Sequence, residues 1–315
     1  MYNIFSRLPA KSLARFKCVS KSMCALFSNP MFVKLHRHKA VILRDPNPIL
    51  KLDSKLFIVD DDDEEWRKAR RLQLPFTSSL DKVELSGSCN GLLCISDQQC
   101  NEDIILFNHT IGGFKKLPLP DFDVPTIESK CFTTVGFGYH HGEDDYKVIR
   151  CVYLYDKPFI DIDSYGCEAR IYSLNTNEWK KIGSVPFHLG YRAGIWLGNE
   201  FIVWKATCGF GRTVRFQIAS FDMDREEFKE IPQPNSSNYS DEKSMEVAMF
   251  GGCLSIFYQS RTDGVDIWSM KDNGWVLLYV ITRPDHIIDD YYMFLKPLLI
   301  LKNGEILLEA GDRER

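Results

Sequence analysis

The sequence of 315 residues has no apolar run long enough for a secretory signal or a membrane span. Its most apolar late stretch, residues 291–301, is interrupted by Lys296 and Pro297. The ten cysteines are scattered without a CxxC pair, which in a chain that is not exported indicates reduced and mostly buried thiols. We therefore expect a protein of the cytosol or the nucleus, with no membrane partner.

The sequence also lacks the local motifs of common enzyme classes, such as GxSxG, the P-loop, HExxH, and a GxGxxG that opens a helix. His140 and His141 lie beside three acidic residues, but adjacent residues of a strand point to opposite faces and do not easily share one metal ion. The acidic run 60–65 lacks the spaced oxygens and glycine of a calcium loop and favours a solvated turn. We expect no catalytic residue, no metal and no cofactor.

Acidic residues are absent from positions 1–40, here called the head. The head contains eight Lys or Arg residues, which leaves a formal charge of −12 for residues 41–315, here called the body, against a total of −4. A basic segment on an acidic chain predicts an acidic partner for the head, and the acidic body is a poor match for nucleic acid.

The head has the pattern of three or four short helices. Its apolar positions have helical spacing in two stripes: Ile4, Phe5 and Leu8, then Leu13, Phe16 and Val19. Pro9 separates the stripes, Ser20 is a predicted N-cap, and Asn29-Pro30 opens a last helix. Because so small a unit cannot bury all of these side chains, we expect another polypeptide to cover the surplus.

The body shows a repeat. Apolar strands that begin with glycine occur at 91–95, 198–204, 252–257 and 304–308, with starts 107, 54 and 52 residues apart. The midpoint of the longest interval falls near an alternating strand, residues 146–153. A period near 53 residues predicts the blades of a β-propeller, whereas the alternative of a β-sandwich explains the strands but not the period.

Pairs of residues seven positions apart run in parallel with this repeat. The pairs are Phe107 and Phe114, Tyr172 and Trp179, Phe221 and Phe228, Trp268 and Trp275, and an imperfect copy, Val59 and Trp66. In a hairpin with an even-numbered loop, such residues lie opposite each other on one face. We therefore expect four-stranded blades, five nearly complete and a partial sixth, with the ring closed by a strand from residues 41–60 or left open.

The head resembles the F-box of plant F-box proteins, in the string from Ile4 to Lys21 followed by Asn29-Pro30-x-Phe32 and His36. Compared with that family the first helix is shortened at its N-terminal end, and Met23 stands where Trp is usual. The resemblance implies binding to the Skp-type adaptor of a cullin ubiquitin ligase. The residues it implies for adaptor binding are Ile4, Phe5, Leu8, Pro9, Ser12, Leu13, Val19 and Met23.

The body resembles the F-box associated domain, a kelch-like relative of the propellers that is also short at its C-terminal end here. The matching strings are 87–92, 136–139 with 144–150, and 172–174 with 179–180. The resemblance implies a mainly β protein with a small α-helical N-terminal domain, namely an F-box over 1–40 and a β-propeller-like domain over 41–315. It further implies a substrate-recognition subunit of a Skp/cullin/F-box ubiquitin ligase, not itself an enzyme, whose target protein and target-binding residues are unknown.

Three other functions stay open at this point. A carbohydrate-binding or hydrolytic propeller requires carboxylates or aromatic platforms that converge at one mouth. A basic arm for nucleic acid or a membrane is disfavoured, because apolar residues occupy too much of the head. The third alternative is a degenerate F-box protein without ligase activity.

Overall fold

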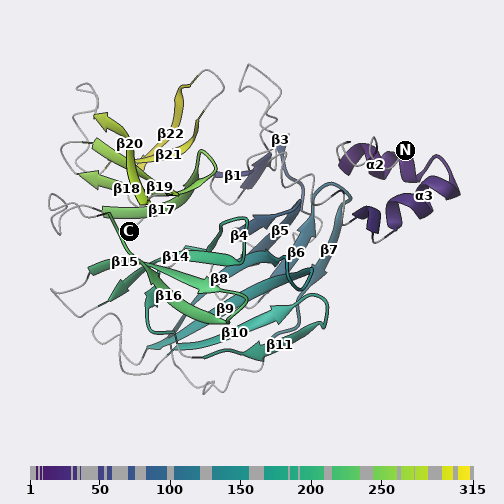
Figure 1. Ribbon diagram of the computed structural model, residues 1–315, viewed down its shortest axis with the longest axis horizontal. Helices are drawn as coiled ribbons and strands as arrows, with labels where there is room; N and C mark the ends of the chain where they lie inside the picture. Colours follow the sequence, from purple (N-terminus) through teal and green to yellow (C-terminus); the bar gives the residue numbers. More distant parts are fainter. Residues whose placement is uncertain are drawn as a thin grey trace. The chain divides into compact units, whose positions relative to one another are not determined.

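The computed structural model describes most of the helical head and the strands of the body (Figure 1). The described residues are 5, 8, 10–29, 31–33, 36, 49–52, 55–58, 70–74, 83–97, 103–120, 130–155, 167–183, 185–190, 192–208, 215–234, 244–260, 264–272, 274–282, 293–300 and 304–312. The predicted pair Val59 and Trp66, and the acidic run 60–65, lie outside them.

The chain divides into two compact units. One comprises Met1–Pro125, Val135–Arg150 and Arg170–Lys180, and the other comprises Thr126–Thr134, Cys151–Ala169 and Lys181–Arg315. The head and the sheets are described below one by one.

Two helices of the head lie where the sequence predicts helices, although the predicted stripe includes Val19 and the first of them ends at Lys17. Helix α2 spans Ala10–Lys17 and helix α3 spans Lys21–Ser28. Ser20 is the N-cap of α3, and its side-chain oxygen accepts the backbone N–H of Met23 at 3.1 Å. The predicted cap is therefore confirmed.

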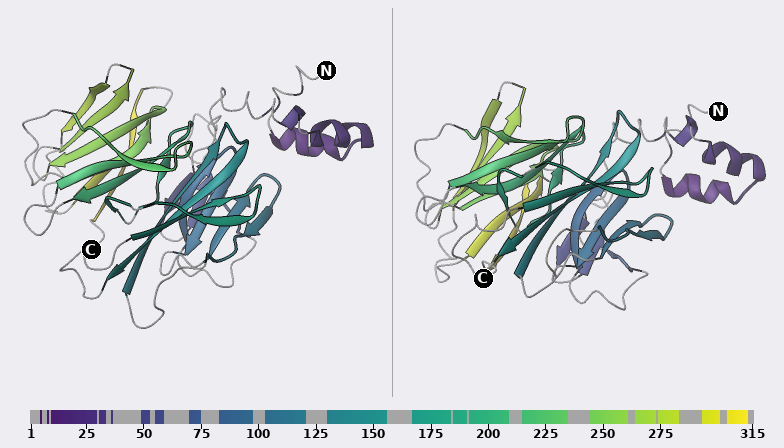
Figure 2. Two further views of the ribbon diagram at one scale, coloured as in Figure 1. Left: turned by 60° about the horizontal axis from the view of Figure 1, so that its bottom comes forward. Right: turned by 90° about the horizontal axis from the view of Figure 1, so that it is seen from below.

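The described strands of the body form six sheets, and two further views show these strands in the colours of the sequence (Figure 2). The first sheet has the order β1 (Ile49–Leu52), β2 (Lys55–Ile58), β3 (Arg70–Arg71). The second has the order β4 (Val83–Cys89), β5 (Leu92–Asp97), β6 (Ile104–Asn108), β7 (Gly113–Lys116). The third has the order β8 (Lys130–His140), β9 (Asp145–Tyr155), β10 (Cys167–Ser173), β11 (Glu178–Lys181).

The remaining sheets continue this pattern. In the fourth, β14 (Phe201–Cys208), β15 (Arg215–Asp222) and β16 (Glu227–Ile231) follow two short strands, β12 (His188–Leu189) and β13 (Ile195–Trp196), which both pair with β14. The fifth has the order β17 (Ser244–Phe250), β18 (Cys253–Ser260), β19 (Gly264–Lys271), β20 (Gly274–Thr282). The sixth pairs β21 (Met293–Ile300) with β22 (Ile306–Asp312).

The glycines that precede the repeated strands have a common conformation. Gly91, Gly198, Gly252 and Gly304 all have a positive φ, between 77° and 87°. In the Asn90-Gly91 and Gly251-Gly252 loops both residues have positive φ, which defines the tight two-residue turn whose twist matches a hairpin. The repeated glycines thus share a positive φ, and two of the four share one type of turn.

The aromatic pairs close the outer hairpins in three sheets. Phe107 lies opposite Phe114, and Phe221 lies opposite Phe228 with ring centroids 4.8 Å apart. The rings of Tyr172 and Trp179 are 5.3 Å apart. These three pairs confirm the predicted contact across four-residue loops.

The fourth pair differs from the prediction. Trp275 lies opposite Met270, and Trp268 lies opposite Leu277. The cause is the loop: Lys271 pairs directly with Gly274, which leaves two loop residues instead of four and shifts the register by two positions. The two tryptophans are therefore diagonal neighbours on one face.

Several consecutive sheets pack face to face through shared apolar clusters. Residues of the first two sheets form one cluster, including Leu56, Leu93 and Phe107. The fourth and fifth sheets share a second, and the fifth and sixth share a third, built around Phe250 and Phe257. Each of these sheets thus has an apolar face covered by the neighbouring one.

Indole hydrogen bonds join outer strands to the preceding sheet at two places. Trp179 of β11 donates its Nε1–H to the carbonyl of Pro118, which follows β7, at 2.7 Å. Trp275 of β20 donates in the same way to Pro232, which follows β16, also at 2.7 Å. We call this contact the indole latch.

The loop between β6 and β7 provides a test of the turn geometry. Gly112 has a φ of 72°, and a Cβ added at this residue would meet no atom within 4 Å, so Gly112→Ala adds backbone strain without a clash. We expect a loss of about 1 kcal/mol in the free energy of unfolding, measured by urea denaturation with tryptophan fluorescence. The neighbouring Gly113→Ala, where φ is not positive, should change it by less than about 0.5 kcal/mol; an equal loss in both variants would contradict this explanation.

Candidate functional site: the surface of the helical head

The head has a small core of its own. Leu13, Phe27 and Phe32 are buried at its centre, with Leu13 only 6% exposed. The Phe5 and Phe27 rings meet edge to face at 5.1 Å, and Phe27 contacts Phe32 at 5.2 Å. These aromatic contacts join α3 to residues before α2 and after α3, and Leu13 of α2 completes the same cluster.

Hydrogen bonds hold the ends of the head together. The side-chain oxygen of Asn29 accepts the backbone N–H groups of Met31 and Phe32, which starts the helical turn after α3. His36 Nε2 lies 2.8 Å from the backbone carbonyl oxygen of Leu8, and its ring stacks on Phe32. His36 thus connects the last described part of the head to the first.

The outer surface of the head combines apolar side chains with positive charge. Val19 is 67% exposed and Met31 is 77% exposed. Arg15 and Lys21 are exposed as well, and the head contains no acidic residue that could neutralise them. This surface suits a partner that offers both apolar side chains and negative charge.

The residues expected to bind an adaptor take different positions. Ile4 and Pro9 lie outside the described residues. Phe5, Leu8 and Met23 are partly buried against the core of the head, and Ser12 is also partly buried. Leu13 belongs to the core of the head, whereas Val19 is 67% exposed. The structure therefore separates them into residues that build the head and residues that a partner can reach.

Met31 was not among the expected residues, although it is the most exposed large apolar side chain of the described head. The sequence carries a weak signal for it. Asn29-Pro30 opens a helix, and Phe32 occupies the inward position of its first turn, so the preceding residue points away from the core.

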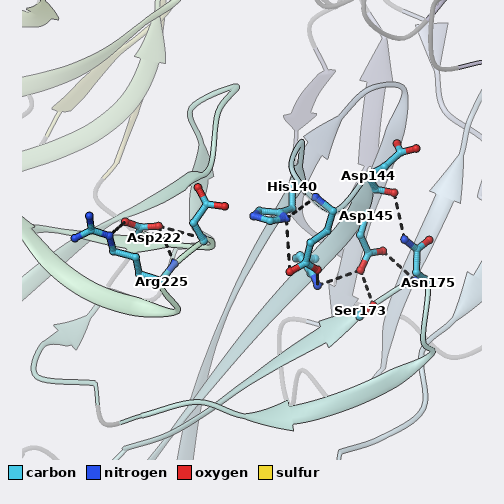
Figure 3. Close-up of polar contacts among 10 residues, drawn as sticks. His140, Asp144, Asp145, Ser173, Asn175, Asp222 and Arg225 are labelled. Atoms are coloured by element: carbon cyan, nitrogen blue, oxygen red, sulfur yellow. Dashed lines mark hydrogen bonds and ion pairs between the residues drawn. The ribbon is translucent and has the colours of Figure 1, made fainter.

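In the body, the strongest polar cluster lies at the turn between β8 and β9 (Figure 3). The buried carboxylate of Asp145 accepts the hydroxyl of Ser173 and, at 2.9 Å, the backbone N–H of Asn175. In a second cluster, Asp222 accepts the backbone N–H groups of Asp224 and Arg225. Both carboxylates accept hydrogen bonds that shape turns.

Lys147 completes the first cluster. Its ammonium lies 2.6 Å from Glu143 Oε2 and 3.2 Å from Asp145 Oδ2. Burial by itself lowers the pKa of Lys147, but the hydrogen bonds and charges of the two carboxylates outweigh it and raise the pKa above 10.5. The cluster is a charge-paired support for the turn.

The two histidines beside it do not converge on a metal. The buried His140 accepts the backbone N–H of Glu143 at its Nδ1, whereas the exposed His141 packs edge-on against Tyr139. Among the described residues no group of three His, Cys, Asp or Glu side chains is placed to hold a metal ion.

The cysteines are less buried than expected. The eight whose side chains the structure describes are free thiols, of which Cys89, Cys94 and Cys151 are buried and Cys18 and Cys24 are exposed. Burial raises the pKa of Cys94 and of Cys151, which keeps these thiols protonated and poorly nucleophilic.

Within the described part of the chain, no helix is both long enough and apolar enough to cross a membrane. Comparison with known proteins agrees with the two-part organisation. The family model for the F-box domain matches residues 1–35, and the model for the F-box associated beta propeller domain matches residues 46–290. The predicted fold class, a short helical F-box followed by a mainly β propeller-like domain, is thereby confirmed.

Curated relatives from Arabidopsis thaliana cover nearly the whole chain. The chain is 30% identical to "F-box protein CPR1" over 98% of its own length and 78% of that protein. It is 29% identical to "F-box/kelch-repeat protein At3g23880", over 98% of its length and 84% of that protein. Among solved structures, oligogalacturonate lyase from Vibrio parahaemolyticus has a TM-score of 0.44 at 12% identity, covering 81% of this chain and 74% of that one, too low to support an argument.

The core of the head should respond differently from its surface. Leu13→Ala removes a buried side chain, so we expect the head to lose about 2–5 kcal/mol of stability, whereas Val19→Ala should cost less than about 0.5 kcal/mol. Hydrogen exchange of the amides in α2 and α3 measures both. Equal protection in the two variants would show that Leu13 is not a core residue.

The Lys147 cluster predicts a dependence on alkaline pH. Because the folded-state pKa of Lys147 is raised, the stability it contributes is present below its unfolded pKa of about 10.5 and is lost as the pH rises through the folded value. Urea denaturation of the unmodified chain should therefore show a decline above about pH 10.5 that is smaller in Lys147→Met. Identical alkaline profiles would exclude this role, and Lys229→Met, at an exposed lysine of β16, is the control.

Proposed function

The chain belongs to the F-box proteins that carry an F-box associated beta propeller domain, and from this premise we propose that it is the substrate-recognition subunit of a Skp/cullin/F-box ubiquitin ligase. In this role the head binds a Skp-type adaptor, the adaptor links the chain to a cullin, and the body binds a target protein. The observation that carries the proposal is the head itself. It closes a core around Leu13 and still presents Val19 and Met31 on a surface without acidic residues.

The division of the expected residues supports this function. Leu13 stabilises the head, so its contribution to adaptor binding is to hold α2 and α3 in place. Val19 and Met31 provide the reachable apolar contact, and covering either side chain fully is worth about 1.5–3 kcal/mol. In most interfaces a few such buried side chains provide most of the affinity.

The positive charge of the head favours association with a negatively charged partner. Arg15 and Lys21 are exposed, lie four and two positions from Val19 in the chain, and have no acidic neighbour in the head. Positive side chains at a rim mainly accelerate encounter with a negatively charged partner and make the association sensitive to salt. An acidic adaptor fits this pattern.

The proposal assigns no chemistry to this chain. The carboxylates of Asp145 and Asp222 are occupied by turns, and the Cys94 and Cys151 thiols are held in the protonated form by burial. In this function, ubiquitin transfer is performed by other subunits in the cytosol or the nucleus. The body only binds the target protein and positions it.

Adaptor binding can be tested with variants that leave the core intact. Val19→Asp combined with Met31→Asp places two negative charges on the exposed surface, and we expect at least a tenfold loss of affinity for a purified Skp-type adaptor. Co-elution in size-exclusion chromatography and titration calorimetry measure it. Phe114→Asp, at an exposed position of β7, is the matched control and should bind like the unmodified chain.

Changes at Leu13 are unsuitable for this test, because they destabilise the head. A failure of the unmodified chain to co-elute with the adaptor would support a degenerate F-box protein without ligase activity. Full binding by the doubly charged variant would instead show that the adaptor uses another surface.

A further inference from the structure

Strand β20 differs from the other outer strands of the body. It is nine residues long, from Gly274 to Thr282, and contains no charged residue. It lies at the end of its sheet (Figure 1), and within the described part of the chain it pairs with β19 alone. Five consecutive apolar side chains, from Val276 to Val280, are between 36% and 60% exposed.

The corresponding strands of three other sheets are short and carry charge. Strand β7 ends in Lys115 and Lys116, β11 has the sequence EWKK, and β16 has the sequence EFKEI. Charged side chains and short length are the usual protection of a sheet edge against unwanted pairing. Since β20 has neither, its edge is suited to receive another strand.

The exposed part of β20 is held firmly at both ends. At its start, the indole latch joins Trp275 to the carbonyl of Pro232. Towards its end, Ile281 packs against the cluster around Phe250 and Phe257, and the Tyr279 ring meets Phe250 edge to face. The apolar residues between are therefore presented by an ordered strand.

The area of this surface argues against a second copy of the chain as its occupant. A side chain of this size has about 150–200 Å² of surface when it is fully exposed. The exposed fractions of the five side chains therefore correspond to a solvent-exposed area of roughly 300–450 Å². Two copies would bury less than the roughly 1,200 Å² of a stable dimer. The surface matches a transient contact.

A bulge in β20 also favours a short segment of a partner over a second copy of the chain. The pairing with β19 skips Leu278, because Ile267 lies opposite Tyr279 and Trp268 lies opposite Leu277. This interruption divides the edge into two regular arms of four residues, Gly274–Leu277 and Tyr279–Thr282. A long rigid strand from another folded copy does not fit such an edge, whereas a short flexible peptide can pair with one arm.

We propose that the Tyr279–Thr282 arm of β20 docks an extended, uncharged apolar segment of the target protein, which adds as a further strand beside it. Main-chain hydrogen bonds supply the contact and the side chains around Val280 select against charge in the peptide. This inference rests on the proposed function, since it names the class of target segment that the body receives.

The test uses the full chain with its adaptor bound and a labelled ten-residue peptide of alternating valine and threonine as the probe. We expect the peptide to bind, and a copy N-methylated on alternate amides to bind at least tenfold more weakly, because N-methylation removes main-chain donors. Val280→Lys should also weaken binding at least tenfold. Phe114→Lys on β7 should leave it unchanged, and thermal unfolding checks that both variants are folded.

Several outcomes would overturn the inference. These are no binding of the unmodified peptide, equal binding of the N-methylated copy, no effect of Val280→Lys, or a dimer in light scattering that Val280→Lys dissociates. Co-elution of each variant with the adaptor is followed in parallel, so that loss of peptide binding alone rejects the β20 site and loss of adaptor binding alone rejects the role of the head.

Discussion

A small sheet that buries side chains on both of its faces cannot cover both of them by itself. The second and fourth sheets of the body are of this kind, because consecutive residues of β6 and of β15 are buried regardless of the face they occupy. Shared apolar clusters join the first sheet to the second, the fourth to the fifth and the fifth to the sixth. A repeated unit suits this requirement, since each such sheet needs a neighbour with a matching apolar face.

The head meets the opposite situation. Among its described residues, two short helices and a following turn enclose a few aromatic and aliphatic side chains. Val19 and Met31 stay exposed in the same segment. The core that stabilises the head and its exposed apolar side chains are therefore built from residues close together in the chain.

Local features of the fold follow well from the sequence. The Ser20 cap, the glycine that precedes each repeated strand and the aromatic pairs across four-residue loops all depend on residues close together in the chain. The register of β19 and β20 does not follow, because the spacing of Trp268 and Trp275 is the same for a two-residue and a four-residue loop. Sequence spacing also identifies Leu13 and Val19 as equal members of one stripe. Only the packing of Phe27 and Phe32 decides that Leu13 is enclosed and Val19 is not.

The indole latch has an acceptor that belongs to the main chain. Trp179 and Trp275 donate to carbonyl oxygens of Pro118 and Pro232, and a carbonyl is present whatever side chain its residue carries. The acceptor of the hydrogen bond is therefore insensitive to side-chain substitution, and only the tryptophan that donates it has to be retained. The segments that follow an outer strand can therefore change their side chains while the hydrogen bond that joins the two sheets persists.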